Sequence, residues 1–404
     1  MASILIITPT VPYPVRANGL TIRANPLVQY LAQRHDVHVL AVDDHRADAA
    51  RYLDEVRKLC ASAEMLAPLS TSFAIRSRLL HALTIRPVPP RRLLNAVTPS
   101  TLRTASTIVS RRACDVALGH GGMTSQALVA LGRRFPTLHR VMDWVDSPSL
   151  LTKREVDQEE GDQQGRIDST VRWERLVNAQ VAHSVYISEA DADFGNHDAR
   201  HNISVIPNGL VDDFAESVNT EWTAPFSQLP RITLGFLGNM GYQPNHAAAV
   251  RLCRDILPAV QARMPDFRVR AKVIGRVPQR ELIDLAGHDV EITGAVDSIW
   301  PAMEDVDVFV FPMTVGAGMQ NKVIEALRAS RPVVVSPVCA GGIPRVDESG
   351  VLVAESAEEI ALQLQSMLSE PDSLRQIVDK GLTFARHLEW GPFLERYEEV
   401  LTSK

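Results

Sequence analysis

The chain has 404 residues, a length typical of roughly two to three domains. Hydrophobic residues make up 45% and charged residues 22%, as in ordinary globular proteins, and the net charge of -6 argues against a nucleic-acid partner. The four cysteines show neither metal-binding nor paired spacing, so we expect no zinc site, no disulfide framework and a reducing, cytoplasmic compartment.

The chain begins with a strand–helix–strand pattern. Ile4–Ile7 is an apolar run without the basic flank of a signal peptide, and residues 8–19 form a Pro-rich loop that ends at Gly19. A helical pattern then leads to a second apolar run, Val37–Val42. This order predicts a parallel sheet, whose ligands bind at the carboxyl ends of the strands, so we expect Gly19 on the ligand side. The absence of G-x-G-x-x-G after the first strand argues against dinucleotide binding.

Residues 70–101 form a segment that is both basic and apolar. Its arginines are Arg76, Arg78, Arg86, Arg91 and Arg92. Such a segment can lie on an anionic membrane surface, which would place the chain peripherally at the inner face of the cell membrane. The alternative is a helix packed on its own domain with solvated arginines. No apolar run reaches the length of a transmembrane helix.

Three more strand patterns follow, at residues 115–122, 140–147 and 181–188. His120 lies at the end of the first, and Asp143 and Asp146 lie at the end of the second. Because the carboxyl ends of parallel strands share one edge, we expect these three side chains near a ligand. The alternatives are an ordinary loop histidine and helix-capping aspartates.

A change of pattern near residue 212 marks the predicted domain boundary. Residues 213–230 lack periodicity and contain prolines, which indicates a linker between an N-terminal domain of residues 1–212 and a second domain of residues 231–389. Residues 390–404 include a predicted helix that starts at about Phe393. Strands of the second domain are expected at residues 232–238, 269–274, 290–293, 307–312 and 333–336.

A glycine-rich turn in the second domain is the clearest candidate site. Thr314–Leu327 reads TVGAGMQNKVIEAL and follows a buried strand pattern, so its glycines fill a strand-to-helix turn. Free amides at such a helix start attract phosphate, and Lys322 adds a positive charge one turn into the helix. Glu325 lies on the same helix face, where its carboxylate suits a polyhydroxyl group. The alternative is an ordinary turn followed by a solvated lysine and glutamate.

Two motifs resemble those of a known family. Gly238–Asn245 reads GNMGYQPN and Gly318–Ala326 reads GMQNKVIEA. Both are similar to motifs of retaining GT-B glycosyltransferases of family 4, and in particular of sugar transferases from bacterial exopolysaccharide clusters. Weaker matches are Asp143–Ser149, Ser188–Asp191 and Asn208–Leu210. The resemblance covers nearly the whole chain. It implies an α/β fold of two Rossmann-like, doubly wound parallel-sheet domains facing a central cleft, with a C-terminal helix that crosses back to the first domain.

The resemblance also implies an activity. Such an enzyme moves a sugar from a nucleotide-diphosphate donor to an acceptor hydroxyl with retention, without a metal or other cofactor, in polysaccharide, glycolipid or glycosylated-metabolite biosynthesis. The acceptor, which is a small molecule, a saccharide or a lipid-linked group, would bind the N-terminal domain. The implied catalytic residues are His120, Asp143, Asp146 and Lys322. The implied donor-binding residues are Gly19, Gly238, Asn239, Met240, Arg276, Val296, Gly318, Met319, Gln320, Asn321, Lys322 and Glu325.

The chain departs from the wider family where that family carries charges. Ala317 stands where a glutamate often contacts the donor sugar, and Asn239 and Pro244 fall near an arginine and a lysine that hold the diphosphate. We expect Lys322, helped by Arg276, to carry that charge instead. The departures keep two alternatives open: a sugar-nucleotide epimerase or phosphorylase of the same architecture, and a non-catalytic nucleotide-sugar binding subunit.

Overall fold

The computed structural model describes residues 1–42, 44–66, 90, 97–157, 164–194, 202–210, 231–315 and 320–403. The arginine-rich segment, the predicted linker and the glycines of the Thr314–Leu327 turn lie outside these ranges. The chain divides into two compact units. The first unit consists of Met1–Val211 with Trp390–Lys404, and the second of Asp212–Glu389.

The first unit is built on a seven-stranded sheet in which every neighbouring pair is parallel. In spatial order its strands are β3 (Ser62–Met65), β2 (Asp36–Ala41), β1 (Ser3–Thr8), β4 (Val116–His120), β5 (His139–Val145), β6 (His183–Tyr186) and β7 (Ile203–Val205). Its helices are α1 (Gly19–Ala32), α2 (Ala49–Leu59), α4 (Pro99–Arg112), α5 (Ser125–Arg134), α6 (Pro148–Val156), α7 (Gln164–Asn178), α8 (Glu189–Asp193) and α17 (Trp390–Thr402).

The second unit repeats this plan on a six-stranded parallel sheet. In spatial order its strands are β10 (Val290–Ile292), β9 (Arg268–Ile274), β8 (Arg231–Leu237), β11 (Val308–Phe311), β12 (Val333–Val335) and β13 (Leu352–Val353). Its helices are α9 (Gln243–Arg251), α10 (Leu257–Arg263), α11 (Arg280–Ile283), α12 (Ile299–Met303), α13 (Asn321–Arg328), α14 (Pro337–Ala340), α15 (Ala357–Ser369) and α16 (Pro371–Arg386). The predicted α/β class is confirmed, and β13 is the one strand of the described second unit that the apolar pattern did not predict.

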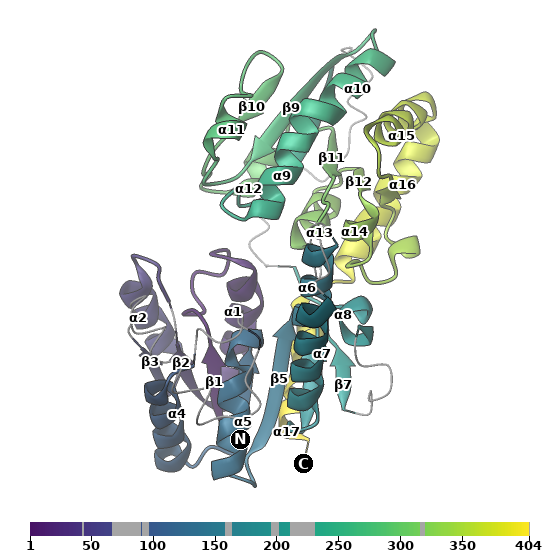
Figure 1. Cartoon of the computed structure of the whole chain (residues 1–404). Coiled ribbons are helices and arrows are strands. Elements are labelled where there is room, and N and C mark those ends of the chain that lie inside the picture. Colours follow the sequence, from purple (N-terminus) through teal and green to yellow (C-terminus); the bar gives the residue numbers. More distant parts are fainter. Residues whose placement is uncertain are drawn as a thin grey trace. The chain divides into compact units, whose positions relative to one another are not determined.

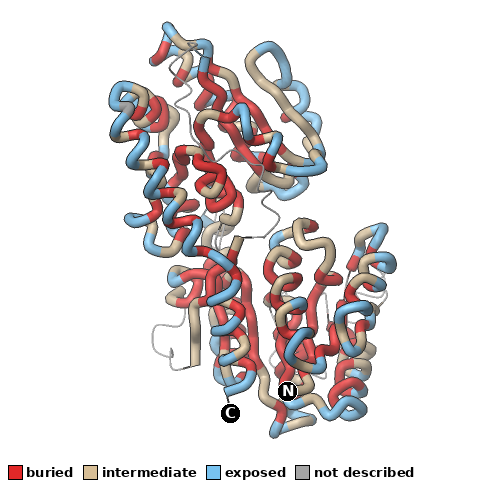
Figure 2. Tube along the Cα trace, turned by 180° about the vertical axis from the view of Figure 1, so that it is seen from behind, coloured by how far each residue is buried: buried red, intermediate tan, exposed pale blue. Residues whose placement is uncertain are grey.

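Helices cover both faces of the first sheet, as Figure 1 shows, and this explains why the central strand β1 is apolar from Ile4 to Ile7. Successive side chains of β1 point to opposite faces, so Leu5 and Ile7 join one core while Ile4 and Ile6 join the other. The strands are accordingly mostly buried in Figure 2.

The C-terminal helix α17 packs on the first unit, as predicted, although it starts at Trp390 rather than at Phe393. Trp390, Leu394 and Tyr397 are buried in the same core as β1 and helix α1. Gly209 allows the approach of Trp390, because a Cβ at this position would lie 2.6 Å from the indole ring. In the sequence, the second unit is therefore inserted between the main part of the first unit and the last helix of that unit.

Within the described residues, none of the helices combines the length and apolarity needed to cross a bilayer.

The burial of Trp390 predicts a measurable role in stability. We expect Trp390→Ala to destabilise the first unit by about 3–5 kcal/mol, because it removes a large side chain from a packed core and leaves a cavity. Urea unfolding followed by far-ultraviolet circular dichroism measures this change. The control is Leu362→Ala, which alters a side chain that is 52% exposed. Equal effects of the two substitutions would contradict the anchoring role of Trp390.

Candidate functional site

The predicted donor-binding residues of the second unit lie where its parallel strands end. Gly238, Asn239 and Met240 follow β8, Arg276 follows β9, and Val296 lies between β10 and α12. Gln320 is the residue before helix α13, whose first turn holds Asn321 and Lys322. Because all neighbouring strands are parallel, these segments share one edge of the sheet. Of the predicted set, Gly318 and Met319 lie outside the described residues.

Close contact between two loops shapes this edge. The amide of Met240 donates to the carbonyl of Arg276 at 3.0 Å, which joins the loops after β8 and β9. Gly275 has φ of 147°, and a Cβ there would lie 1.7 Å from the carbonyl oxygen of Gly238. Only glycine fits such a conformation and such an approach. The Arg276 side chain is exposed at this edge, where it can meet a ligand.

Lys322 joins the two motifs that carried the family resemblance. Its Nζ donates to Oδ1 of Asn245, the last residue of the GNMGYQPN loop, at 2.5 Å. The Nδ2 of Asn245 in turn donates to the carbonyl of Asn239 at 3.1 Å. The structure thus brings together residues 77 positions apart, and it does so through the cation that the sequence singled out.

The Lys322 ammonium is buried in largely uncharged surroundings. It is 8% exposed, so the alternative of a solvated helix lysine is wrong. Besides Asn245 it contacts the sulfur of Met313 at 3.3 Å and lies 5.0 Å and 5.7 Å from the ring centroids of Phe236 and Phe311. Burial lowers the pKa of Lys322 to about 8, and the nearby Glu325 only partly offsets this effect. An added anion would stabilise the charged form.

In the first unit, Asp143 and His120 belong to a closed buried network. The Nε of Arg23, on helix α1, donates to both Asp143 oxygens at 3.1 and 3.0 Å, and both side chains are fully buried. Burial alone would raise the pKa of Asp143, but the Arg23 charge and the His120 hydrogen bond hold it well below its usual range. Arg23 also donates to Asn208 at 2.9 Å and stacks on the Tyr397 ring of α17, at 5.1 Å.

His120 is placed to hold the loop at the start of α1. Its Nδ1 lies 2.8 Å from Asp143 and its Nε2 lies 3.1 Å from the carbonyl oxygen of Leu20. His120 therefore links the end of β4 to Asp143 of β5 and to the first turn of α1. His120 is also fully buried at the end of β4, which corrects the alternative of an ordinary loop histidine. The hydrogen bonds described for His120 and Asp143 join both side chains to groups of the first unit.

Asp146 differs from Asp143 because it remains partly exposed. It follows Val145, whose φ of 64° is unusual for a β-branched residue. Burial, reinforced by the charge of Asp191, raises the pKa of Asp146 above its usual range. The helix-capping alternative does not hold for Asp146, because the Ser147 hydroxyl caps α6 by accepting from the Leu150 amide.

A buried glutamate that the sequence analysis missed supports this loop. Glu174, on α7, accepts hydrogen bonds from the Ser147 hydroxyl at 3.0 Å, the Ser149 amide at 3.1 Å and the Tyr186 hydroxyl at 2.8 Å. Burial raises the pKa of Glu174 to about 7, although these donors oppose the rise. The only signal in the sequence is a charged residue on the helix face shared with Val177 and Thr170.

The remaining predicted residues take simpler positions. Gly19 is the first residue of α1, and the side chain of the preceding Asn18 caps this helix. Glu325 is buried on α13. Among the described residues, no group of His, Cys, Asp and Glu side chains is arranged to hold a metal ion.

Comparison with solved structures identifies the fold. Sucrose-phosphate synthase from Thermosynechococcus elongatus is 15% identical, with 98% of each chain covered and a TM-score of 0.67. The Anabaena protein HepE in complex with UDP is 14% identical, with 100% of each chain covered and a TM-score of 0.64. The chain has the GT-B fold. An α,α-trehalose-phosphate synthase (UDP-forming) from Burkholderia vietnamiensis is a further match, at 14% identity, full coverage of both chains and a TM-score of 0.63.

The second unit of this GT-B chain also matches a sequence family. Residues 231–370 match the family model described as Glycosyl transferases group 1, so the second unit carries a domain of this group. The match includes both Asn245 and Lys322. No curated protein sequence matches the chain.

We expect substitution of Asp143 and of Asp146 by asparagine to have opposite effects on the stability of the first unit. Asp143→Asn should destabilise the first unit by about 3–5 kcal/mol, because it leaves the buried Arg23 without its counter-charge. Asp146→Asn should be stabilising at pH 5 and more strongly stabilising at pH 8. Its raised pKa means that the folded state holds a proton that the unfolded state releases, so wild-type stability falls as the pH rises above the usual carboxyl range.

Urea midpoints of the wild type and both variants at pH 5 and pH 8 test this pair. Equal destabilisation by the two substitutions would mean that the charge environments of Asp143 and Asp146 do not differ as described.

Proposed function

We propose that the chain is a retaining, metal-independent glycosyltransferase that moves a hexosyl-type sugar from a nucleotide-diphosphate donor to an acceptor hydroxyl. The observation that carries this proposal is the buried Lys322 ammonium, held by Asn245 at the strand ends of a glycosyl transferases group 1 domain. An ammonium with uncharged hydrogen-bond partners attracts an anion, and a nucleotide diphosphate is the anion that donor sites of this group of enzymes accept.

The charge on Lys322 suits the chemistry of the transfer. As the bond to the sugar breaks, negative charge grows on the leaving diphosphate, and stabilising it is expected to be the largest catalytic contribution. Lys322 and the amides at the start of α13 are proposed to do this without a metal. Arg276 would assist from the neighbouring loop, and Glu325 would accept hydrogen bonds from ribose hydroxyls. HepE was solved with UDP, which makes UDP the first nucleotide to test.

On the acceptor side, the geometry favours Asp146 among the predicted catalytic residues. Asp143 and His120 are buried and fully occupied by the Arg23 network, whereas Asp146 is partly exposed at the end of β5. The carboxyl group of Asp146 can orient an acceptor hydroxyl, and in its ionised form it can take the proton of that hydroxyl. We therefore propose that Asp146 contacts the acceptor, and that Asp143 and His120 position the surrounding loops.

The cellular setting follows from the same proposal. An acceptor that is a saccharide or a lipid-linked group would belong to polysaccharide, glycolipid or glycosylated-metabolite biosynthesis in the cytoplasm. The arginine-rich segment around Arg76–Arg92 would then touch the inner face of the membrane. Binding to vesicles with and without anionic lipid tests this contact.

Lys322→Met is the sharpest test of the donor site. Methionine keeps much of the apolar bulk but removes the charge, so UDP should bind roughly tenfold to a hundredfold more weakly, which corresponds to about 1.5–3 kcal/mol. Transfer from UDP-sugars should fall by at least as much. Calorimetry and a transfer assay measure the two effects. Lys380→Met, which changes an exposed lysine of the same unit, is the control.

The outcomes separate the proposal from its alternatives. UDP binding with sugar transfer supports it, binding with interconversion of the donor sugar indicates an epimerase, and binding without turnover indicates a binding subunit. Wild-type affinity in Lys322→Met would show that the diphosphate is held elsewhere. A panel with GDP, TDP and ADP covers the case in which UDP is the wrong nucleotide.

The lowered pKa of Lys322 predicts a pH dependence of binding. Above about pH 8 the free protein increasingly holds a neutral amine at this position, so anion binding must take up a proton and the affinity should fall. Calorimetric titrations with UDP from pH 7 to 9.5 check this expectation. The loss of affinity should disappear in Lys322→Met, and a parallel loss in that variant would assign the titration to another group.

A further inference from the structure

A cavity lies in the first unit, at the opposite end of the strands from Asp146. It has a volume of about 790 Å³ and is formed where β4, β5 and β6 begin. Arg140, the second residue of β5, lines it, whereas Asp146 follows the last residue of the same strand. With a rise of roughly 3.3 Å per residue, the two positions are about 20 Å apart along the strand. The cavity is therefore separate from the proposed acceptor site.

Arg140 places an incompletely paired cation in this cavity. Its Nε is buried without a hydrogen-bond partner, and burial lowers the pKa of the guanidinium. A buried donor without a partner costs about 1–3 kcal/mol, more when the group is charged. The position is nevertheless built into the fold. Gly132 of α5 makes room for it, because a Cβ at residue 132 would lie 1.9 Å from a terminal guanidinium nitrogen of Arg140.

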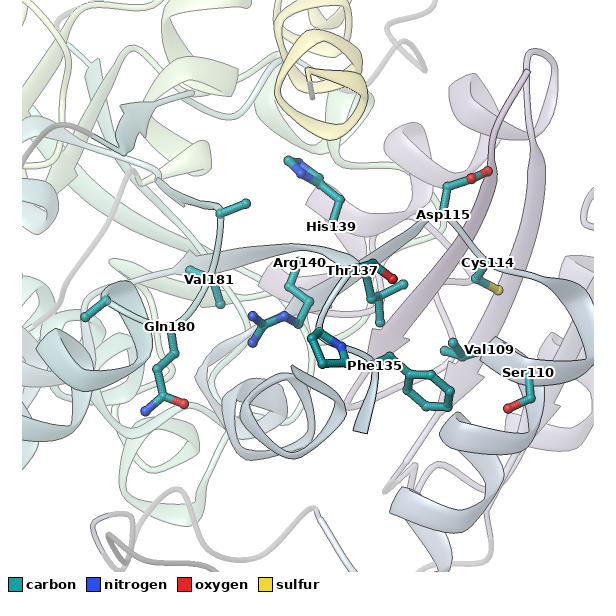
Figure 3. A pocket seen from close by; sticks show the side chains of 14 residues that line it. Val109, Ser110, Cys114, Asp115, Phe135, Thr137, His139, Arg140, Gln180 and Val181 are labelled. Carbon is teal, nitrogen blue, oxygen red and sulfur yellow. The ribbon is translucent and has the colours of Figure 1, made fainter. Parts of the chain in front are cut away.

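The other walls of the cavity are a mixture of apolar and polar groups. Figure 3 shows Arg140 among Thr137, Gln180 and Val181, with Phe135 also lining the cavity. Asp115 lines the end away from Gln180, and its carboxylate accepts a hydrogen bond from the Ser3 amide at 3.0 Å. A ligand that fits must therefore bring an acceptor to Arg140 and an apolar surface to the walls.

We propose that this cavity binds a small organic anion, whose carboxylate or phosphate pairs with Arg140 and whose apolar body lies against Phe135 and Val181. A guanidinium is a planar donor group that suits such oxyanions, which can accept two parallel hydrogen bonds from it. A binding site on this scale is common in proteins, where apolar walls surround a few directed polar groups. The proposal does not depend on the activity of the donor site.

The test is a calorimetric titration of the full chain with three probes at constant ionic strength: benzoate, phenyl phosphate and inorganic phosphate. We expect saturable binding of one molecule per chain for at least one aromatic probe, and weaker binding of inorganic phosphate, which lacks the apolar body. The preferred aromatic probe distinguishes a carboxylate from a phosphate ligand. UDP titrations of the same samples report on the donor site separately.

Two variants locate the binding. Arg140→Gln should weaken binding of the aromatic probe at least tenfold. Arg111→Gln, which changes an exposed arginine at the end of α4, should leave this affinity unchanged. Gly132→Ala keeps every charge but displaces the flexible end of Arg140, so it should weaken binding of the probe to a similar extent. Circular dichroism and UDP binding confirm that each variant is folded. The proposal is overturned if no probe saturates, or if the affinity is unchanged in both Arg140→Gln and Gly132→Ala.

Discussion

Each unit buries a cation at the carboxyl ends of its parallel strands, and the two cations are compensated in different ways. Arg23 has a carboxylate within 3.0 Å, and both side chains of the pair are removed from water. Lys322 has an amide oxygen, a sulfur and two aromatic faces. Removing an ion from water costs several kcal/mol. The Asp143 carboxylate offsets this cost for Arg23, whereas Lys322 is surrounded mainly by uncharged groups, with the charge of Glu325 nearby.

Arg23 brings together residues that are far apart in the sequence. The Asp143 carboxylate lies 120 residues from Arg23, the Asn208 amide lies 185 residues away, and Tyr397 comes from the final helix. Because the Arg23–Asp143 pair is fully buried, loss of one member leaves an uncompensated charge near His120 and Leu20. The loops at the carboxyl ends of the first sheet therefore depend on a helix that follows the entire second unit in the sequence.

The sequence predicted the strands well because most are continuous apolar runs, and it predicted Lys322 and the GNMGYQPN loop because their spacing resembles a known family. It did not predict β13, which has only two residues and half-exposed side chains. Nor did it predict that Asp143 would pair with the buried Arg23, or that His120 would form a hydrogen bond with Asp143. Arg23 lies on the apolar face of α1, near Leu27, and local periodicity cannot reveal which distant side chain will oppose it. Burial of Lys322 was missed for the same reason, since the rings beneath it belong to β8 and β11.

Asn245 is uncharged, and this determines the electrostatic surroundings of the Lys322 ammonium. An aspartate at this position would form a buried ion pair with Lys322 and cancel most of the field that an anion experiences. An amide oxygen instead orients the ammonium through one short hydrogen bond and leaves its net charge intact, while the faces of Phe236 and Phe311 favour the cation through their electron-rich rings. If Lys322 binds a diphosphate as proposed, its attraction would be stronger than that of a solvated lysine, because the low local dielectric strengthens each charge interaction. Lys322 would in this way replace the arginine and lysine that the resembled family carries near Asn239 and Pro244.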